Sequence, residues 1–266
     1  MSTPDLAIIG TGRLGEAILR ALLESGSWSP EAIVCTTRRA EHADELASTY
    51  GVATTTDNRA AVADVSIVVL ALKPQILLDV LDELGGAITA PLVVSVAAGI
   101  GTDAIESRVA SAAVVRAMPN TPLLVGTGMT ALAAGSRASA DDVAAAAALF
   151  SAAGRTVTVD ESAMDAVTAV SGSGPAYVFR LAAAMLAGAV AEGLDEATAR
   201  ALVTQTLVGA ATMLDVYGEP AALAAQVTSP GGTTAAALDA FDAQGFDAIV
   251  ADAIAAARRR SRELGA

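Results

Sequence analysis

Three chemically active side chains are nearly absent from this chain of 266 residues, which has one cysteine (Cys35), one histidine (His42) and one lysine (Lys73). A single cysteine excludes an intramolecular disulfide framework and a cysteine-based structural zinc site, and it is typical of a reducing compartment. A single histidine excludes metal sites built from several histidines and most Ser-His or Cys-His machinery. The sequence therefore predicts a cytoplasmic protein without a metal site, in which any lysine chemistry would have to use Lys73.

Positive charge is also scarce, because 16 basic side chains stand against 29 acidic ones and the formal net charge is −13. A field of this sign repels polyanions, so we expect neither nucleic acid nor an anionic membrane surface as a partner. The chain opens without the basic and apolar regions of a secretion signal. Its most apolar stretch, residues 176–191, contains Arg180 and is shorter than the roughly 20 residues of a membrane span, which predicts a buried helix.

Apolar residues make up 53% of the chain, enough for a large core and too much for disorder. Up to about residue 160, short apolar runs alternate with amphipathic segments, and this alternation predicts a doubly wound parallel α/β sheet. The expected strands are 6–10, 32–36, 52–53, 65–71, 91–96, 113–117, 129–133 and 155–159. The expected helices are 13–25, 39–50, 74–84, 102–109 and 140–153, with a polar turn at 54–58.

Beyond Glu161 the strand patterns stop and alanine-rich helical patterns follow. We therefore predict two domains, an α/β domain over residues 1–160 and an all-helical domain over residues 161–266. Several of the helices in the second domain are apolar on more than one side, so a lone copy would leave apolar surface in water. A homodimer would cover that surface, and further assembly of dimers is possible.

A glycine-rich turn carries the first chemical signal. Residues 10–15 (Gly10, Thr11, Gly12, Arg13, Leu14 and Gly15) follow a predicted strand and open a predicted helix. Glycines at this spacing permit a tight turn, a close approach of backbone N–H groups to a pyrophosphate, and tight packing of the helix on the strand. The turn predicts a dinucleotide site, and the alternative is an ordinary strand-to-helix turn.

The second predicted strand ends in Thr36, Thr37, Arg38 and Arg39, where an NAD site would carry an acidic residue for the ribose. Arginine beside hydroxyl groups suits a 2′-phosphate, so we expect NADPH, with NADH possible but less favoured. The alternative is that both arginines only solvate a helix start. His42 is expected on the helix surface near the adenine end of the cofactor, and Cys35 as a small buried residue.

Four further segments are candidates for the site, each with a structural alternative. Lys73 and the loop 116–122 lie at the carboxyl edge of the predicted sheet, where ligands bind in open α/β folds, but they also suit a solvated helix start and a rigid connection. In the helical domain, Ser171-Gly-Ser-Gly-Pro175 and Ser229-Pro-Gly-Gly-Thr-Thr234 are glycine-rich. The second offers bare N–H groups and two hydroxyls at a helix start, which suits a carboxylate. A helix kink and an ordinary N-cap are the alternatives.

Together these segments resemble the pyrroline-5-carboxylate reductase family. The resemblance runs along the whole chain, through residues 10–15, 72–75, 94–100, 116–122, 165–177 and 229–234. It implies an N-terminal Rossmann domain, a C-terminal helical dimerisation domain, and NADPH-dependent reduction of the cyclic imine 1-pyrroline-5-carboxylate to L-proline. Hydride attack on carbon is helped by a positive charge on the imine nitrogen, so the substrate can enter as its iminium and needs no strong acid.

The resemblance also implies roles for individual residues. Asn58 would meet the adenosine ribose, Ala71 and Lys73 would edge the cofactor, and Met118, Pro119 and Asn120 would line the nicotinamide side. The substrate carboxylate would be held by Ser229, Gly231, Gly232, Thr233 and Thr234, and the catalytic Thr234 hydroxyl would lie near the ring nitrogen. The sequence departs from the family at Leu14, usually Met, and at Ala224 and Ala225, often Lys-Asp.

Two other classes of protein share part of this pattern. A hydroxyacid or ketoacid reductase would also combine a dinucleotide domain with helices, but it would be expected to carry a catalytic lysine in the helical domain, and the sequence has none there. A non-catalytic NADP sensor would have no need of the Ser229–Thr234 segment.

Overall fold

The structure, a computed structural model, describes residues 4–265 and divides into two compact units. One unit contains the residues up to Ser173 together with those from Ala257 onward. The other contains Gly174–Ala256. The first unit holds the whole sheet and is described first.

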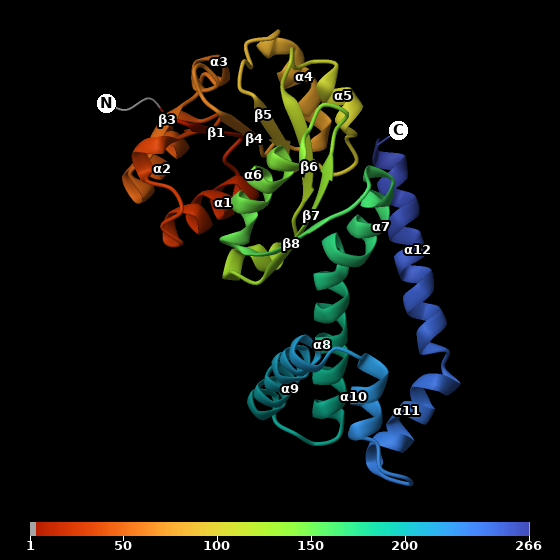
Figure 1. The fold of residues 1–266 in the computed structure, drawn as a ribbon. Coiled ribbons are helices and arrows are strands. Elements are labelled where there is room, and N and C mark those ends of the chain that lie inside the picture. Colours follow the sequence, from red (N-terminus) through yellow and green to blue (C-terminus); the bar gives the residue numbers. More distant parts are fainter. Residues whose placement is uncertain (1–3, 266) are drawn as a thin grey trace. The chain divides into compact units, whose positions relative to one another are not determined.

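Eight strands form one sheet in the order β3-β2-β1-β4-β5-β6-β7-β8 (Figure 1). They are β1 (Leu6–Ile9), β2 (Ile33–Thr36), β3 (Ala53–Thr55), β4 (Ile67–Leu70), β5 (Leu92–Ser95), β6 (Ala113–Met118), β7 (Gly128–Ala134) and β8 (Gly154–Thr158). The order of the first six is that of a doubly wound dinucleotide-binding sheet, which reverses between β1 and β4. The predicted fold class is confirmed.

One strand departs from the predicted parallel arrangement, because β7 pairs antiparallel with β6. The two strands are joined by the short 3₁₀ turn η2 (Thr121–Val125). A parallel pair needs a crossover of a dozen or more residues, and this connection is shorter. β8 is parallel to β7, and the longer helical segment between them allows that.

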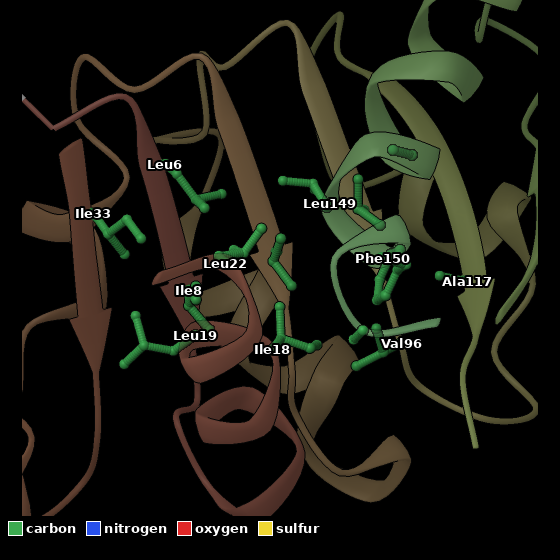
Figure 2. Packing of buried hydrophobic residues seen from close by; sticks show 14 of the residues in the cluster. Leu6, Ile8, Ile18, Leu19, Leu22, Ile33, Val96, Ala117, Leu149 and Phe150 are labelled. Atoms are coloured by element: carbon green, nitrogen blue, oxygen red, sulfur yellow. The ribbon is translucent and has the colours of Figure 1, made fainter. Parts of the chain in front are cut away.

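Helices cover both faces of the sheet. They are α1 (Arg13–Glu24), α2 (Ala40–Tyr50), α3 (Asn58–Ala61), α4 (Pro74–Leu84), α5 (Thr102–Glu106) and α6 (Ala140–Ser151). Side chains of α1, α2 and α6 share one buried cluster with the sheet, and those of α3, α4 and α5 share another. Figure 2 shows the first, with Leu22 of α1 and Phe150 of α6 against the strands.

The alternating direction of side chains along β1 explains why this strand is continuously apolar. Leu6 and Ile8 belong to the first cluster, whereas Ala7 and Ile9 belong to the second. All four are fully buried, as expected for a central parallel strand with helices on both sides. Cys35 on the neighbouring strand is also fully buried, and burial raises the pKa of its thiol to about 11.

A polar cluster ties the segment after β8 to the sheet. Glu161 accepts hydrogen bonds from the backbone N and the hydroxyl of Thr102 at 2.7 and 2.6 Å. The Arg116 side chain on β6 is 7% exposed and lies 3.6 Å from the same carboxylate. Four residues later, the Asp165 carboxylate accepts from the Ser261 hydroxyl at 2.7 Å. These contacts place residues 161–165 firmly in the first unit.

The helical segment that follows is irregular at its start. After η3 (Glu161–Ala163) and α7 (Met164–Val167), residues Thr168–Gly172 form a π-helical turn. Met164 is buried against Ala131 and Ala133 of β7. The sequence predicts an interruption of the helical pattern at Ser171–Pro175. The π-helical turn begins three residues before this segment and includes its first two residues. Such turns are frequent at functional sites.

The second unit is helical, as the sequence predicts. It contains α8 (Gly174–Ala191), α9 (Glu196–Tyr217), α10 (Pro220–Gln226), α11 (Thr233–Ala243) and the first part of α12 (Phe246–Gly265). The predicted burial of residues 176–191 is wrong for the single chain, because none of the residues of α8 is buried. Phe179 is 67% exposed, and Leu202 and Val208 on α9 are each 54% exposed. By length and composition alone, residues 161–191 would also pass for a membrane span.

Candidate active site

A cavity of about 760 Å³ lies at the carboxyl edge of the sheet, where the strand order reverses. Open α/β sheets bind their ligands at this place. Most of the residues that line it follow β1, β2, β3 and β4 or belong to the first turns of the helices after them, and Thr36 at the end of β2 and Val80 in the second turn of α4 complete the lining. The lining includes nine of the predicted cofactor residues, namely Gly10, Gly12, Arg13, Thr37, Arg38, Arg39, Asn58, Ala71 and Lys73.

The three glycines of the first turn are explained by three different observations. Gly10 has a φ of +87°, which disfavours any residue with a side chain. At Gly15 an added Cβ would lie 3.0 Å from the carbonyl oxygen of Gly10 and 3.2 Å from Cβ of Ala71, so a glycine is needed for close packing. At Gly12 neither reason applies, because its φ is −89° and an added Cβ would meet no atom within 4 Å. The backbone at Gly12 is therefore open to the close approach of a ligand.

The start of α1 offers donors to such a ligand. Gly12 caps the helix without a side-chain bond, and the first intrahelical hydrogen bond runs from Glu16 N to Gly12 O. The N–H groups of Arg13, Leu14 and Gly15 therefore have no partner within the helix. Together with the helix dipole they form a site that favours an anion. Leu14 itself packs on the first buried cluster and does not line the cavity.

The glycine turn is fastened to the end of β2. Gly10 N donates to the hydroxyl oxygen of Thr36 at 3.0 Å, and Thr11 N donates to the Thr36 carbonyl oxygen at 2.7 Å. Residues 37–39, the segment predicted to bind the ribose, begin directly after Thr36. The two hydrogen bonds to Thr36 therefore hold the glycine turn at a fixed position relative to this segment.

The part of the cavity next to the end of β2 is lined by basic side chains. Arg38 and Arg39 are exposed and border the cavity, and within residues 4–265 no ion pair holds either of them. The lining has one carboxylate, Glu16, which accepts a hydrogen bond from the Tyr50 hydroxyl at 2.9 Å. Burial, and then this carboxylate, raise the pKa of Tyr50. The residues fit a dinucleotide that carries an additional phosphate on its ribose.

Met118, Pro119 and Asn120 do not line this cavity. Met118 is the last residue of β6 and the other two follow it, and contacts from Met118 and Asn120 reach the π-helical turn of residues 168–172. An added Cβ on Gly172 would lie 2.6 Å from Cε of Met118, and the Asn120 amide donates to Ser171. The structure therefore joins two segments that the sequence singled out separately, residues 116–122 and 171–175.

The segment Ser229–Thr234 lies in the helical unit and forms a tight turn that leads into α11. Gly232 N donates to Ser229 O at 2.9 Å, with Pro230 and Gly231 as the central residues of the turn. Gly231 has a φ of +66°, as the third residue of a type II turn requires. Gly232 caps α11 without a side-chain bond, so the N–H groups of Thr233 and Thr234 have no intrahelical partner. Thr233 is exposed and Thr234 is half-buried.

Eight residues of the cavity lining were not among the predicted site residues. They are Thr11, Glu16, Thr36, His42, Thr56, Leu72, Ile76 and Val80. Thr11 and Thr36 lie within residues 10–15 and 36–39, so their positions in the sequence alone could have indicated them as site residues. His42 was expected near the adenine end as a surface side chain, and its contact with the turn joins residues 31 positions apart, which no local pattern reveals.

Comparisons with known proteins match both parts of the chain. Residues 161–264 match the family model described as pyrroline-5-carboxylate reductase dimerisation, and residues 5–99 match that of the NADP oxidoreductases described as coenzyme F420-dependent. Pyrroline-5-carboxylate reductase of Synechocystis sp. is 44% identical over 262 residues, which cover 98% of each chain. Among solved structures, the pyrroline-5-carboxylate reductase of Coxiella burnetii is 34% identical with a TM-score of 0.92, covering 100% of both chains. That of Plasmodium falciparum with NADP bound is 26% identical with a TM-score of 0.88 over 100% of both.

Proposed function

The chain belongs to the pyrroline-5-carboxylate reductase family, and from this premise we propose how its residues carry out NADPH-dependent reduction of 1-pyrroline-5-carboxylate to L-proline, the last step of proline biosynthesis. The observation that carries the proposal is the convergence of the glycine turn and the arginine pair on one cavity. NADPH, when bound, supplies the hydride that reduces the carbon of the C=N bond. The residues of the chain bind, orient and shield the reactants.

The dinucleotide is held at both of its phosphate-bearing ends. Gly10, Gly12, Arg13, Leu14 and Gly15 form the turn and helix start that receive the pyrophosphate. Thr37, Arg38 and Arg39 bind the 2′-phosphate, and Asn58 lies beside the ribose. The lack of a carboxylate at the end of β2 makes NADPH the preferred cofactor, with NADH as a weaker one.

The nicotinamide end of the cofactor is bordered by the segment after β4 and by the end of β6 with the loop that follows it. Ala71 and Lys73 border the cavity, and Lys73 stands directly before α4. Met118, Pro119 and Asn120 line the nicotinamide side, where the contact with Ser171 keeps their loop in place.

The substrate carboxylate is received by the turn before α11. Ser229, Gly231, Gly232, Thr233 and Thr234 provide hydroxyls and unpaired N–H groups at a helix start that favours an anion. The Thr234 hydroxyl supports the ring nitrogen, which carries the proton of the iminium when the substrate enters. No strong acid is then required, in keeping with a chain that has a single histidine. Ala224 and Ala225, both exposed on α10, provide no polar side chain to this site.

The two domains divide these tasks. Residues 1–160 bind the dinucleotide, and residues 161–266 provide the substrate segment and the contacts between subunits. The exposed apolar side chains of α8 and α9, such as Phe179 and Leu202, are those that a second copy covers. The chain assembles as a homo-oligomer, built on a dimer of the helical domain. This assembly accounts for the apolar composition of residues 161–191 without a membrane.

A cytoplasmic location is part of the same proposal. It is supported by the single thiol, Cys35, which is buried and unpaired. The substrate and cofactor are both small metabolites.

The activity is tested by following NADPH oxidation with 1-pyrroline-5-carboxylate and with a panel of ketoacids, and by identifying the product. We expect L-proline from the imine, little turnover of the ketoacids, and a lower kcat/KM with NADH than with NADPH. Equal turnover of a ketoacid would favour the hydroxyacid or ketoacid reductase class. Binding of NADPH without turnover of any substrate would favour a sensor.

A further inference from the structure

His42 stands out among the side chains of the cofactor cavity, because both of its ring nitrogens face oxygen atoms. Nε2 lies 3.0 Å from the carbonyl oxygen of Thr11, in the glycine turn. Nδ1 lies 3.2 Å from Oε2 of Glu45, one helical turn along α2. The ring itself is half-buried and borders the cavity together with Thr37, Arg38 and Arg39.

The contact with Thr11 completes a three-point attachment of the glycine turn. Two of the points are the bonds from Gly10 N and Thr11 N to Thr36 at the end of β2. The third lies on the opposite side of the Thr11 residue, where its carbonyl oxygen accepts from His42. The turn for the pyrophosphate and the segment for the 2′-phosphate are thereby held in one fixed relation.

The chemistry of the partner fixes the direction of the bond to Thr11. A carbonyl oxygen only accepts hydrogen bonds, so Nε2 of His42 is the donor. His42 belongs to the first turn of α2, and the bond therefore ties the start of this helix to the glycine turn.

We propose that His42 is a positioning residue for the cofactor, which holds the glycine turn in place through its hydrogen bond to Thr11. The inference rests on the cofactor pocket assigned above. It predicts that loss of this bond weakens the binding of any adenosine ligand with a 5′-phosphate, and that a different side chain with a donor at the same place restores the binding.

Two fragments of the cofactor test this by calorimetry on the full chain. The fragments are 5′-AMP, which has only the 5′-phosphate, and 2′,5′-ADP, which has both. His42→Gln keeps a donor near the position of Nε2, while His42→Ala removes it. Asp44→Asn is the matched control, because Asp44 is an exposed residue of the same helix that does not border the cavity.

We expect His42→Ala to bind both fragments about two- to tenfold more weakly, the range of one lost hydrogen bond. His42→Gln and Asp44→Asn should bind both fragments like the wild type, because the donor to Thr11 is kept in both variants.

Equal affinities of the wild type and His42→Ala for both fragments would overturn the inference while leaving the pocket intact. Binding by His42→Gln as weak as that by His42→Ala would overturn the role of the donor. If the wild type itself bound 2′,5′-ADP no more tightly than 5′-AMP, the assigned NADPH pocket would be wrong, and the inference would fall with it. Circular dichroism ensures that folded proteins are compared.

Discussion

The amide of Asn120 joins the loop after β6 to the π-helical turn, because Nδ2 donates to both the carbonyl and the hydroxyl oxygen of Ser171 at 3.3 Å. On its other side, Oδ1 accepts from Met129 N at 2.9 Å. All three contacts use the amide in one orientation, with the nitrogen toward Ser171. The loop that carries Met118 and Pro119 is therefore held between β7 and the start of the helical segment.

The substitution Asn120→Asp tests this arrangement. The carboxylate keeps the acceptor for Met129 N but faces the Ser171 carbonyl oxygen without a proton to donate. We expect the free energy of unfolding to fall by about 1–3 kcal/mol at neutral pH, the cost of an unsatisfied polar contact. Protonation of the new carboxyl restores a donor, so the deficit relative to the wild type should shrink toward acidic pH. Ser171→Ala, which removes only the hydroxyl, should cost less, and a larger loss in that variant would contradict the assignment.

The second prediction concerns Gly12, the glycine without a structural reason of its own. Since an added Cβ meets no atom within 4 Å, Gly12→Ala should change the free energy of unfolding by less than about 1 kcal/mol. It should nevertheless weaken NADPH binding about tenfold or more, because the methyl group occupies the place of the pyrophosphate. Fluorescence titration and thermal unfolding measure the two effects.

Gly15→Ala provides the matched contrast. Its Cβ would press on the Gly10 carbonyl oxygen and on Ala71, so a loss of about 1–3 kcal/mol of stability is expected. Equal NADPH affinity in Gly12→Ala and the wild type would show that no ligand approaches this turn.

The third prediction concerns cofactor preference. Arg38 borders the cavity, and a charge-assisted hydrogen bond contributes roughly 1.5–3 kcal/mol, so Arg38→Ala should lower kcat/KM for NADPH about tenfold or more. The value for NADH should change little. Arg108, whose Nε lies 2.9 Å from Asp82 and which does not border the cavity, offers a control in Arg108→Ala. Equal losses with both cofactors in Arg38→Ala would contradict its role at the 2′-phosphate.

The fourth prediction concerns Thr234. Thr234→Val removes the hydroxyl and nearly keeps the shape, so turnover should fall about two- to twelvefold, the range of one neutral hydrogen bond, or more if the bond strengthens in the transition state. The KM for the imine should change less, because the N–H groups at the start of α11 still bind the carboxylate. Steady-state rates with both substrates varied give the two constants. Thr233→Val is the control. If Thr233→Val loses more turnover than Thr234→Val, the hydroxyl of Thr234 only caps the helix and does not support the ring nitrogen.

Features set by local pattern could be predicted from the sequence. The glycine turn, the apolar strands and the arginines at the end of β2 can each be recognised from residues that are neighbours in the sequence. The structure brings the glycine turn and the arginines to one cavity. The polar turn expected at 54–58 instead leads into α3, because the Asp57 carboxylate accepts from Arg59 N and Ala60 N at 2.9 and 3.2 Å and starts a helix.

Features that depend on distant partners could not be predicted. The bond of His42 to Thr11 and that of Asn120 to Ser171 connect positions 31 and 51 residues apart, and neither leaves a periodic signal. The exposure of α8 in the single chain has another explanation. It agrees with the homodimer that the sequence predicts, because apolar helices that stay exposed in one copy are expected to pack against a second.

The measurement that tests the central claim most directly is the position of the label in the product when pyrroline-5-carboxylate is incubated with NADPH deuterated at C4 of the nicotinamide, with each C4 epimer used in turn. Reduction of the imine by this enzyme predicts L-proline with one deuterium at C5, the former imine carbon, from one of the two epimers. Magnetic resonance of the purified product reads this position. Proline that carries no deuterium from either epimer, or no proline at all, would contradict the account.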